Sequence, residues 1–274
     1  MKFLIAAPSL GASSVGRENN INLIRLAAAI AVVISHSALI TAGREAMPPL
    51  MWLLGSIAVW VFFSISGFLI ARSFDRAPSS VDYCAARVLR IFPALAACVV
   101  VTALVLGPMV TSEPLSSYLV SSDLWRFLFG NLTLFWESRA LPGVFKDHPV
   151  DHAQITFWTL KFEMICYIGV LLLGTLGAFR NRILFAAFAA SFVLLWALAV
   201  YAVETADNST GVLPKSLNSF LKVGIYFVLG MIAYVFREHV RLNAIAAATL
   251  VILLLALWWT PLFHVLMPLA IVYT

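Results

Sequence analysis

The chain has 274 residues, of which 62% are hydrophobic and 11% charged, with a formal net charge of +5. Soluble globular domains are about half apolar and about a quarter charged. The composition therefore excludes a water-soluble enzyme, a nucleic-acid-binding protein and a disordered chain. It indicates a membrane protein with several spans, whose surroundings are membrane lipid and which has no nucleic-acid partner.

Apolar segments long enough to cross a bilayer, about 20 residues each, succeed one another along most of the chain. They are residues 22–41, 51–71, 91–110, 157–174, 183–203, 220–236 and 244–260, with an eighth that begins after Pro261 and is cut at Thr274. The sequence predicts an all-α polytopic membrane helix bundle with about eight spans, the last incomplete. Since Thr274 falls inside a span, we expect the chain to be truncated at its C-terminus.

Basic residues are distributed unevenly across these spans. Residues 1–18 are expected to form a cytoplasmic tail, because the apolar run at 3–7 is too short for the core of a signal peptide. With the N-terminus inside, 11 Lys and Arg residues lie inside and seven outside, and the charges sum to +7 and −2. Basic residues are retained on the cytoplasmic side, so we expect this orientation, in the cell inner membrane.

One connection, residues 111–156, is long, and this orientation places it outside. Its apolar stretch 124–136 is too short to span and is expected to form an interfacial or re-entrant helix. His148 and His152 have the spacing of metal ligands, but Pro149 interrupts them and no helix is evident. The three cysteines Cys84, Cys98 and Cys166 contain no CxxC pair. We therefore expect no bound metal.

Two ionisable residues lie within the first span, where charged groups are costly and often functional. Arg25 and His36 are eleven residues apart, close to three helical turns, so they share one helix face roughly 16 Å apart along the axis. Taken singly, Arg25 can extend to the inner interface and His36 can be satisfied between helices. The aligned pair favours a functional site.

Glu163 lies near the outer end of the fourth span, with Tyr167 on its face at i+4. Because the first span ends outside and the fourth begins there, His36 and Glu163 are expected at similar depth. A histidine beside a carboxylate suits general base chemistry, in which the carboxylate orients the imidazole. A structural polar pair is the alternative, and Lys161 can instead pair with Glu163 or extend outward.

The segment 72–90 is expected to be an arginine-rich inner loop that leads into the third span. Arg87 and Arg90 lie one turn apart, just before Ile91-Phe92-Pro93. Two guanidinium groups on one face can bind phosphoryl oxygens bidentately. The plainer interpretation, favoured by composition alone, is a pair of anchors for lipid phosphates.

Several of these segments, in this order, resemble motifs of the acyltransferase 3 family of membrane acyltransferases. The matching segments are Asn22-Leu-Ile-Arg25 with His36, Phe62-Phe-Ser-Ile-Ser-Gly-Phe68 for FFxxSGF, Arg87-Val-Leu-Arg90-Ile-Phe-Pro93 for RxxRIxP, and Phe157-Trp-Thr-Leu-Lys-Phe-Glu163 with Tyr167 for WSLxxExxxY. Smaller similarities are Leu106-Gly-Pro108, Leu141-Pro-Gly-Val-Phe145 and Phe227-Val-Leu-Gly230. On this resemblance, residues 19–274 are expected to form one transmembrane acyltransferase-3-like domain, incomplete at the C-terminus.

The resemblance implies an enzyme that moves an acyl group, commonly acetyl from acetyl-CoA, to a hydroxyl of an extracytoplasmic carbohydrate or glycolipid. It implies that His36 is the general base or an acyl relay with Glu163 as its partner, and that Arg25, Arg87 and Arg90 bind the CoA phosphates. This reverses the composition-based preference for lipid anchors at Arg87 and Arg90. Two alternatives stay open: a proton-coupled transporter or flippase, and an inactive truncated remnant.

Overall fold

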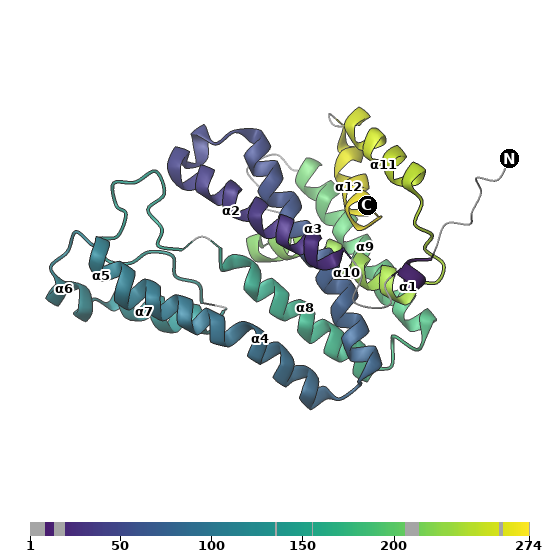
Figure 1. Cartoon of the computed structure of the whole chain (residues 1–274), viewed down its shortest axis with the longest axis horizontal. Helices are drawn as coiled ribbons and strands as arrows, with labels where there is room; N and C mark the ends of the chain where they lie inside the picture. Colours follow the sequence, from purple (N-terminus) through teal and green to yellow (C-terminus); the bar gives the residue numbers. More distant parts are fainter. Residues whose placement is uncertain are drawn as a thin grey trace. The chain divides into compact units, whose positions relative to one another are not determined.

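The computed structural model describes residues 9–13, 20–134, 136–154, 156–205, 214–257 and 260–273. Across these ranges the chain forms helices and no strand (Figure 1). One isolated bridge joins Ser9 and Arg241. The helices are α1 (Leu10–Ser13), α2 (Ile21–Ala46), α3 (Pro49–Arg76), α4 (Ser80–Val101), the π-helix Thr102–Leu106, α5 (Gly107–Val110), α6 (Leu115–Val120), α7 (Ser122–Leu132), α8 (Trp158–Thr175), α9 (Arg182–Thr205), α10 (Lys215–Val235), α11 (Ala244–Ala256) and α12 (Pro261–Tyr273). The predicted all-α class is confirmed. Most of the predicted tail, residues 1–18, lies outside the described residues.

Six described segments are long and apolar enough to cross a membrane: α2, α3, Ser80–Val110, α8, most of α9, and α10. The last two of the eight predicted spans coincide with α11 and α12, which have 13 residues each. A helix of that length is about 20 Å long, shorter than the ~30 Å hydrocarbon core of a bilayer. The polytopic helical character predicted from the sequence therefore stands, with six full-length candidates.

The third span begins earlier than predicted, and the expected loop 72–90 is wrong. α3 continues to Arg76 and α4 already starts at Ser80, so only residues 77–79 connect them. The reason is a helix start signal: the Ser79 hydroxyl accepts a 3.3 Å hydrogen bond from the main-chain N–H of Asp82, and Asp82 places a negative charge in the first turn. Arg87 and Arg90 lie one turn apart on this helix, as their spacing predicts, and only the bounds of the loop are wrong.

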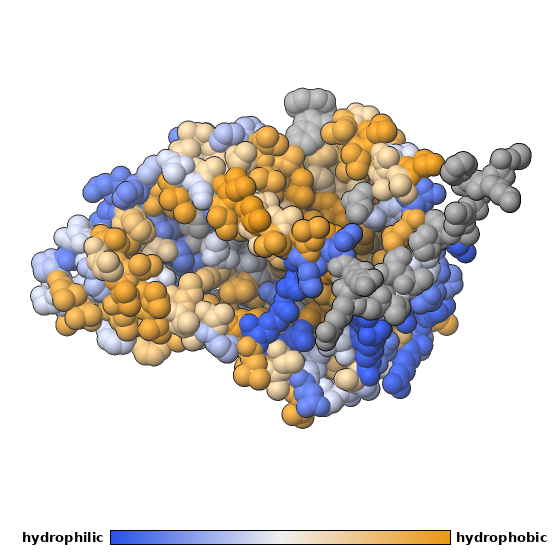
Figure 2. Space-filling model, in the orientation of Figure 1, coloured by the Kyte–Doolittle hydropathy of each residue, from blue (hydrophilic) through white to orange (hydrophobic). Residues whose placement is uncertain are grey.

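Large apolar side chains remain exposed on the long helices. Examples are Leu172 on α8, Leu194 and Leu198 on α9, and Ile252 on α11, which are 55–64% exposed. The space-filling view shows extensive hydrophobic surface (Figure 2). Soluble proteins rarely expose contiguous apolar patches of more than a few hundred Å². The surface is that of helices solvated by lipid.

The described residues fall into two compact units, one formed by 9–32, 54–78 and 169–273, the other by 33–53 and 79–168. In the first unit, α3 and α10 approach through two glycines. A Cβ added to Gly67 would overlap the main-chain carbonyl of Phe227, and one added to Gly230 would overlap the carbonyl of Ser64. Small residues allow this close backbone approach in membrane helices. The motif segment Phe62–Phe68 on α3 therefore packs against the motif segment Phe227–Gly230 on α10.

The second unit contains a π-helical turn that follows from its sequence. Gly107 donates its main-chain N–H to Thr102, five residues back, which leaves the carbonyl of Ala103 without its usual helical partner. The buried Tyr118 of α6 donates its hydroxyl to that carbonyl at 2.6 Å, and its burial raises the pKa of the phenol, so it stays a donor. A side chain at Gly107 would collide with this hydroxyl. The Leu106-Gly-Pro108 segment therefore anchors α6.

The stretch 124–136 contains a helix, as predicted, and the helix is α7, Ser122–Leu132. It packs on α4. The loop that follows is held by the buried Asn131, whose amide donates to the main-chain carbonyls of Phe127 and Ser138 at 2.8 Å each. The short helix α6 before it was not predicted.

Candidate active site

Glu163 and Tyr167 lie one turn apart on α8, and the predicted i, i+4 relationship is confirmed. The hydroxyl of Tyr167 donates a short hydrogen bond to a carboxylate oxygen of Glu163. Tyr167 is 1% exposed, while Glu163 is half-buried. A hydroxyl that donates to the carboxylate fixes the orientation of the carboxylate. Glu163 is thus held in place within its own helix.

Arg87 lies between two aromatic rings. Its guanidinium carbon is 5.5 Å from the ring centroid of Tyr83 and 5.6 Å from that of Tyr167. Guanidinium groups over aromatic faces at this distance are attracted by the ring quadrupole. These contacts orient the cation without neutralising it, because neither ring carries a charge.

One atom of this arginine lacks a hydrogen-bond partner. Nε of Arg87 is buried, and among the described residues no acceptor reaches it. A buried charged donor without an acceptor is costly, by about 1–3 kcal/mol or more. An anionic ligand with oxygen acceptors would satisfy it. The arrangement is compatible with the phosphate-binding role that the family resemblance implies for Arg87, which stays a prediction.

The sequence prediction missed Tyr83, although it lies four residues before Arg87 on the same helix face. Tyr83 is 6% exposed, and its hydroxyl donates a 3.0 Å hydrogen bond to the main-chain carbonyl of Tyr167. This bond joins α4 to α8. It brings Arg87 to Tyr167 and, through the Tyr167 hydroxyl, to Glu163.

The other predicted site residues are placed as follows. Arg90 is exposed on α4, and its charge lies within electrostatic range of the Tyr167 phenol. His36 is half-buried on α2, next to the buried Ser35, in the same unit as Glu163. Arg25 is half-buried on α2 in the other unit. The pairing of His36 with Glu163, and the joint role of the three arginines, stay predictions.

Lys161 takes neither of its two predicted positions. Its ammonium lies 3.7 Å from a carboxylate oxygen of Glu137 and 5.1 Å from the ring centroid of Phe162. Glu137 also accepts a 2.9 Å bond from Arg139, and its side chain is only 12% exposed. Lys161 therefore connects the segment after α7 with the start of α8. The carboxylate of Glu163 is bound by Tyr167 instead.

The expected absence of a metal centre stays a prediction. Across the described ranges, no group of three or more His, Cys, Asp or Glu side chains is arranged to hold a metal ion. His148 and His152 lie outside any helix.

This geometry defines the class of the protein. It is a polytopic helical membrane protein in which a carboxylate, two tyrosines and an arginine gather between two of the spans. Comparison with known proteins gives the family. The model of the acyltransferase 3 family, described as an acyltransferase domain, matches residues 18–273. The chain belongs to this family.

Two curated relatives match parts of the chain. An O-acetyl transferase of Shigella phage Sf6 is 34% identical over 154 residues, which cover 56% of this chain and 44% of that protein. Nodulation protein 10 of Rhizobium leguminosarum bv. viciae is 40% identical over 88 residues, 30% of this chain and 23% of that protein. The matched stretches thus span less than half the length of either relative. No solved structure matches the chain significantly.

Proposed function

We propose that the protein is an O-acyltransferase that moves an acyl group, specifically acetyl, from cytoplasmic acyl-CoA to a hydroxyl of an extracytoplasmic carbohydrate. Membership of the acyltransferase 3 family supports acyl transfer, and the name of the phage relative supports acetyl as the group and oxygen as the acceptor atom. The observation that carries the proposal is the cluster in which Tyr167 contacts both Glu163 and Arg87.

The donor-binding role is assigned to the arginines. Arg87 retains a buried Nε without an acceptor, and its charge is not neutralised by a carboxylate among the described residues. Phosphate oxygens of acyl-CoA can accept from such a guanidinium bidentately. Arg90 lies one turn further on α4, where it adds a second positive charge. Arg25, on α2, is assigned to the same donor on the family resemblance alone.

His36 is assigned the chemical step, as general base or as acyl relay. As general base it removes the proton from the acceptor hydroxyl, whose oxygen attacks the thioester carbonyl. The carbon–sulfur bond breaks, and the imidazolium returns its proton to the CoA thiolate. As relay, the imidazole attacks the thioester carbonyl, and the carbon–sulfur bond breaks to release CoA as its thiolate. The acceptor oxygen then attacks the acyl group, the bond between the acyl carbon and the imidazole nitrogen breaks, and the hydroxyl proton passes by way of the freed imidazole to the thiolate. Glu163 stabilises the positive imidazole in either route.

The orientation proposed for this reaction comes from the distribution of charge. The arginine-rich ends of α3 and α4 are assigned to the cytoplasm, because basic residues are retained there. His36 and Glu163 then lie nearer the opposite side, with the long connection 111–156 outside. This orientation separates the entry of the donor from that of the acceptor. We assign the protein to the cytoplasmic membrane as part of the same proposal.

The experiment that tests the proposal is transfer of labelled acetyl groups by the full chain in sealed liposomes. Acetyl-CoA is supplied on one side and a set of glycans on the other, and products on both sides are measured. We expect covalently labelled glycan together with free CoA. Proton-coupled glycan uptake without covalent labelling would contradict the proposal and favour a transporter.

A further inference from the structure

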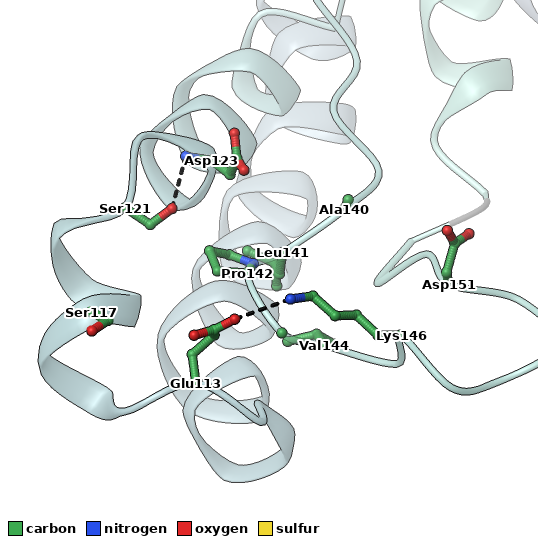
Figure 3. A pocket seen from close by; sticks show the side chains of 11 residues that line it. Glu113, Ser117, Ser121, Asp123, Ala140, Leu141, Pro142, Val144, Lys146 and Asp151 are labelled. Carbon is green, nitrogen blue, oxygen red and sulfur yellow. Dashed lines mark hydrogen bonds and ion pairs between the residues drawn. The ribbon is translucent and has the colours of Figure 1, made fainter.

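The second unit contains a cavity of about 430 Å³ that takes no part in the cluster described above (Figure 3). Its volume lies in the range of small-molecule pockets, about 300–1,000 Å³. It is lined by Glu113, Ser117, Ser121, Asp123, Ala140, Leu141, Pro142, Gly143, Val144, Lys146 and Asp151. All of these residues belong to the connection 111–156.

Hydrogen bonds between two segments fix the shape of this cavity. The hydroxyl of Thr111 donates to the carbonyl of Pro142 at 2.7 Å, and the main-chain N–H of Ser112 donates to Gly143 at 3.0 Å. Gly143 has φ +67°, and a Cβ there would lie 2.6 Å from the Thr111 hydroxyl. Only glycine meets both conditions. The Leu141-Pro-Gly-Val-Phe145 segment is thus a preformed wall.

The lining is rich in hydrogen-bonding groups that carry more negative than positive charge. Glu113, Asp123 and Asp151 supply three carboxylates, and Lys146 supplies one ammonium, bound to Glu113 at 3.0 Å. The sticks in Figure 3 show that Lys146 and Glu113 extend toward each other across the cavity. The hydroxyls of Ser117 and Ser121 add further donors and acceptors. An anionic ligand would meet net repulsion here.

These charges are accessible to a ligand. The side chain of Asp123 is 61% exposed and pairs with Arg126 at 3.6 Å, while that of Asp151 is 68% exposed and pairs with His152 at 3.0 Å. Exposed ion pairs contribute little to stability, so a ligand can replace them at low cost. No metal site forms from these carboxylates in the described part of the chain.

We infer that this cavity binds the acceptor, and that the acceptor it takes is a neutral polyhydroxylated sugar. The inference rests on the proposed function, because it requires an extracytoplasmic acceptor. Carboxylates accept from sugar hydroxyls, serine hydroxyls exchange bonds with them, and Leu141 and Val144 form an apolar floor under the ring. The surplus of carboxylates over ammonium groups in the lining disfavours an acidic sugar.

A labelling experiment measures binding without requiring transfer. Ser117→Cys in the full chain in liposomes is treated with a membrane-impermeant maleimide, with the unsubstituted chain as background for the native cysteines. We expect the neutral methyl glycosides of glucose, galactose, mannose and rhamnose, or at least one of them, to slow labelling several-fold. Methyl glucuronide should not. Asp147→Cys, which is exposed in the same connection and outside the lining, should label at an unchanged rate.

A kinetic experiment separates this inference from the proposed function. Asp123→Asn combined with Asp151→Asn should raise KM for the neutral glycoside about tenfold, by weakening hydrogen bonds to it, with kcat and KM for acetyl-CoA unchanged. Asp147→Asn is the matched control. Transfer by the unsubstituted chain with no difference between the double variant and the control would overturn the cavity assignment alone. Absence of transfer to every acceptor would overturn the proposed function, and protection of Ser117→Cys by none of the four glycosides would overturn the inference.

Discussion

The hydroxyl of Tyr83 on α4 donates a 3.0 Å hydrogen bond to the main-chain carbonyl of Tyr167 on α8, across 84 residues of sequence. This bond links the helix that carries Arg87, the proposed donor-binding residue, to the helix that carries Glu163, the proposed partner of the base. We call the bonded pair of tyrosines the support of the site. Tyr167 contacts Arg87 with its ring and Glu163 with its hydroxyl. Four predictions test this support and, separately, the packing of α3 against α10.

Replacement of Tyr83 by phenylalanine should loosen the support while keeping the aromatic ring over which Arg87 lies. The loss of one buried hydrogen bond is expected to cost about 0.5–1.5 kcal/mol of stability. We expect a lower Tm in detergent and a higher KM for acetyl-CoA. An unchanged Tm together with an unchanged KM would show that the bond does not position Arg87.

Replacement of Arg87 by lysine keeps the positive charge and removes the planar guanidinium. We expect KM for acetyl-CoA to rise about tenfold, because a lysine cannot bind phosphate bidentately or stack between two rings. Arg180→Lys is a matched control, since Arg180 is exposed and lies just before α9. Equal KM values for the two variants would contradict the assignment of Arg87 to the donor.

Replacement of Tyr167 by phenylalanine removes the hydroxyl that orients Glu163 and keeps the ring beside Arg87. We expect kcat to fall by about 10–100-fold, by analogy with the loss seen when a partner that orients a metal-ligating side chain is removed. KM for acetyl-CoA should change little. A large rise in this KM with an unchanged kcat would place the hydroxyl in donor binding and not beside the base.

Replacement of Gly67 by alanine should push α3 and α10 apart, since the added methyl overlaps the carbonyl of Phe227. Overpacking of this kind costs about 1–3 kcal/mol. Gly169→Ala is the control, because a Cβ at Gly169 on α8 has no atom within 4 Å. The fraction of folded protein after mild heating in detergent measures the difference, and equal values for the two variants would rule out the close packing.

Much of this architecture was predictable from sequence periodicity and composition. Long apolar runs mark the helices because a bilayer sets their length, and the i, i+4 spacing of Glu163 and Tyr167 predicts their contact. The start of α4 was missed because the apolar pattern begins only at Ile91. The helix begins about three turns before Ile91, because the polar residues Ser79 and Asp82 stabilise its N-terminus.

Contacts between segments distant in sequence could not be predicted in the same way. Nothing in the spacing of Glu137 and Lys161 relates the two, so the choice of Glu137 over Glu163 depends on tertiary packing. The same holds for the bond between Tyr83 and Tyr167. The motif glycines Gly67 and Gly230 were predictable in part. The sequence shows each as part of a separate motif segment, and only the structure shows that each faces the backbone of the other's helix.

The central claim is that His36 carries acyl transfer, and one measurement tests it directly. Labelled acetyl transfer from acetyl-CoA to glycan is compared among the unsubstituted full chain, His36→Ala and His148→Ala, each inserted in liposomes at equal amounts. His148 is an exposed histidine in the connection 111–156 and serves as the matched control. The account predicts that transfer falls to background in His36→Ala and is unchanged in His148→Ala. Transfer by His36→Ala at the rate of the unsubstituted chain would contradict it.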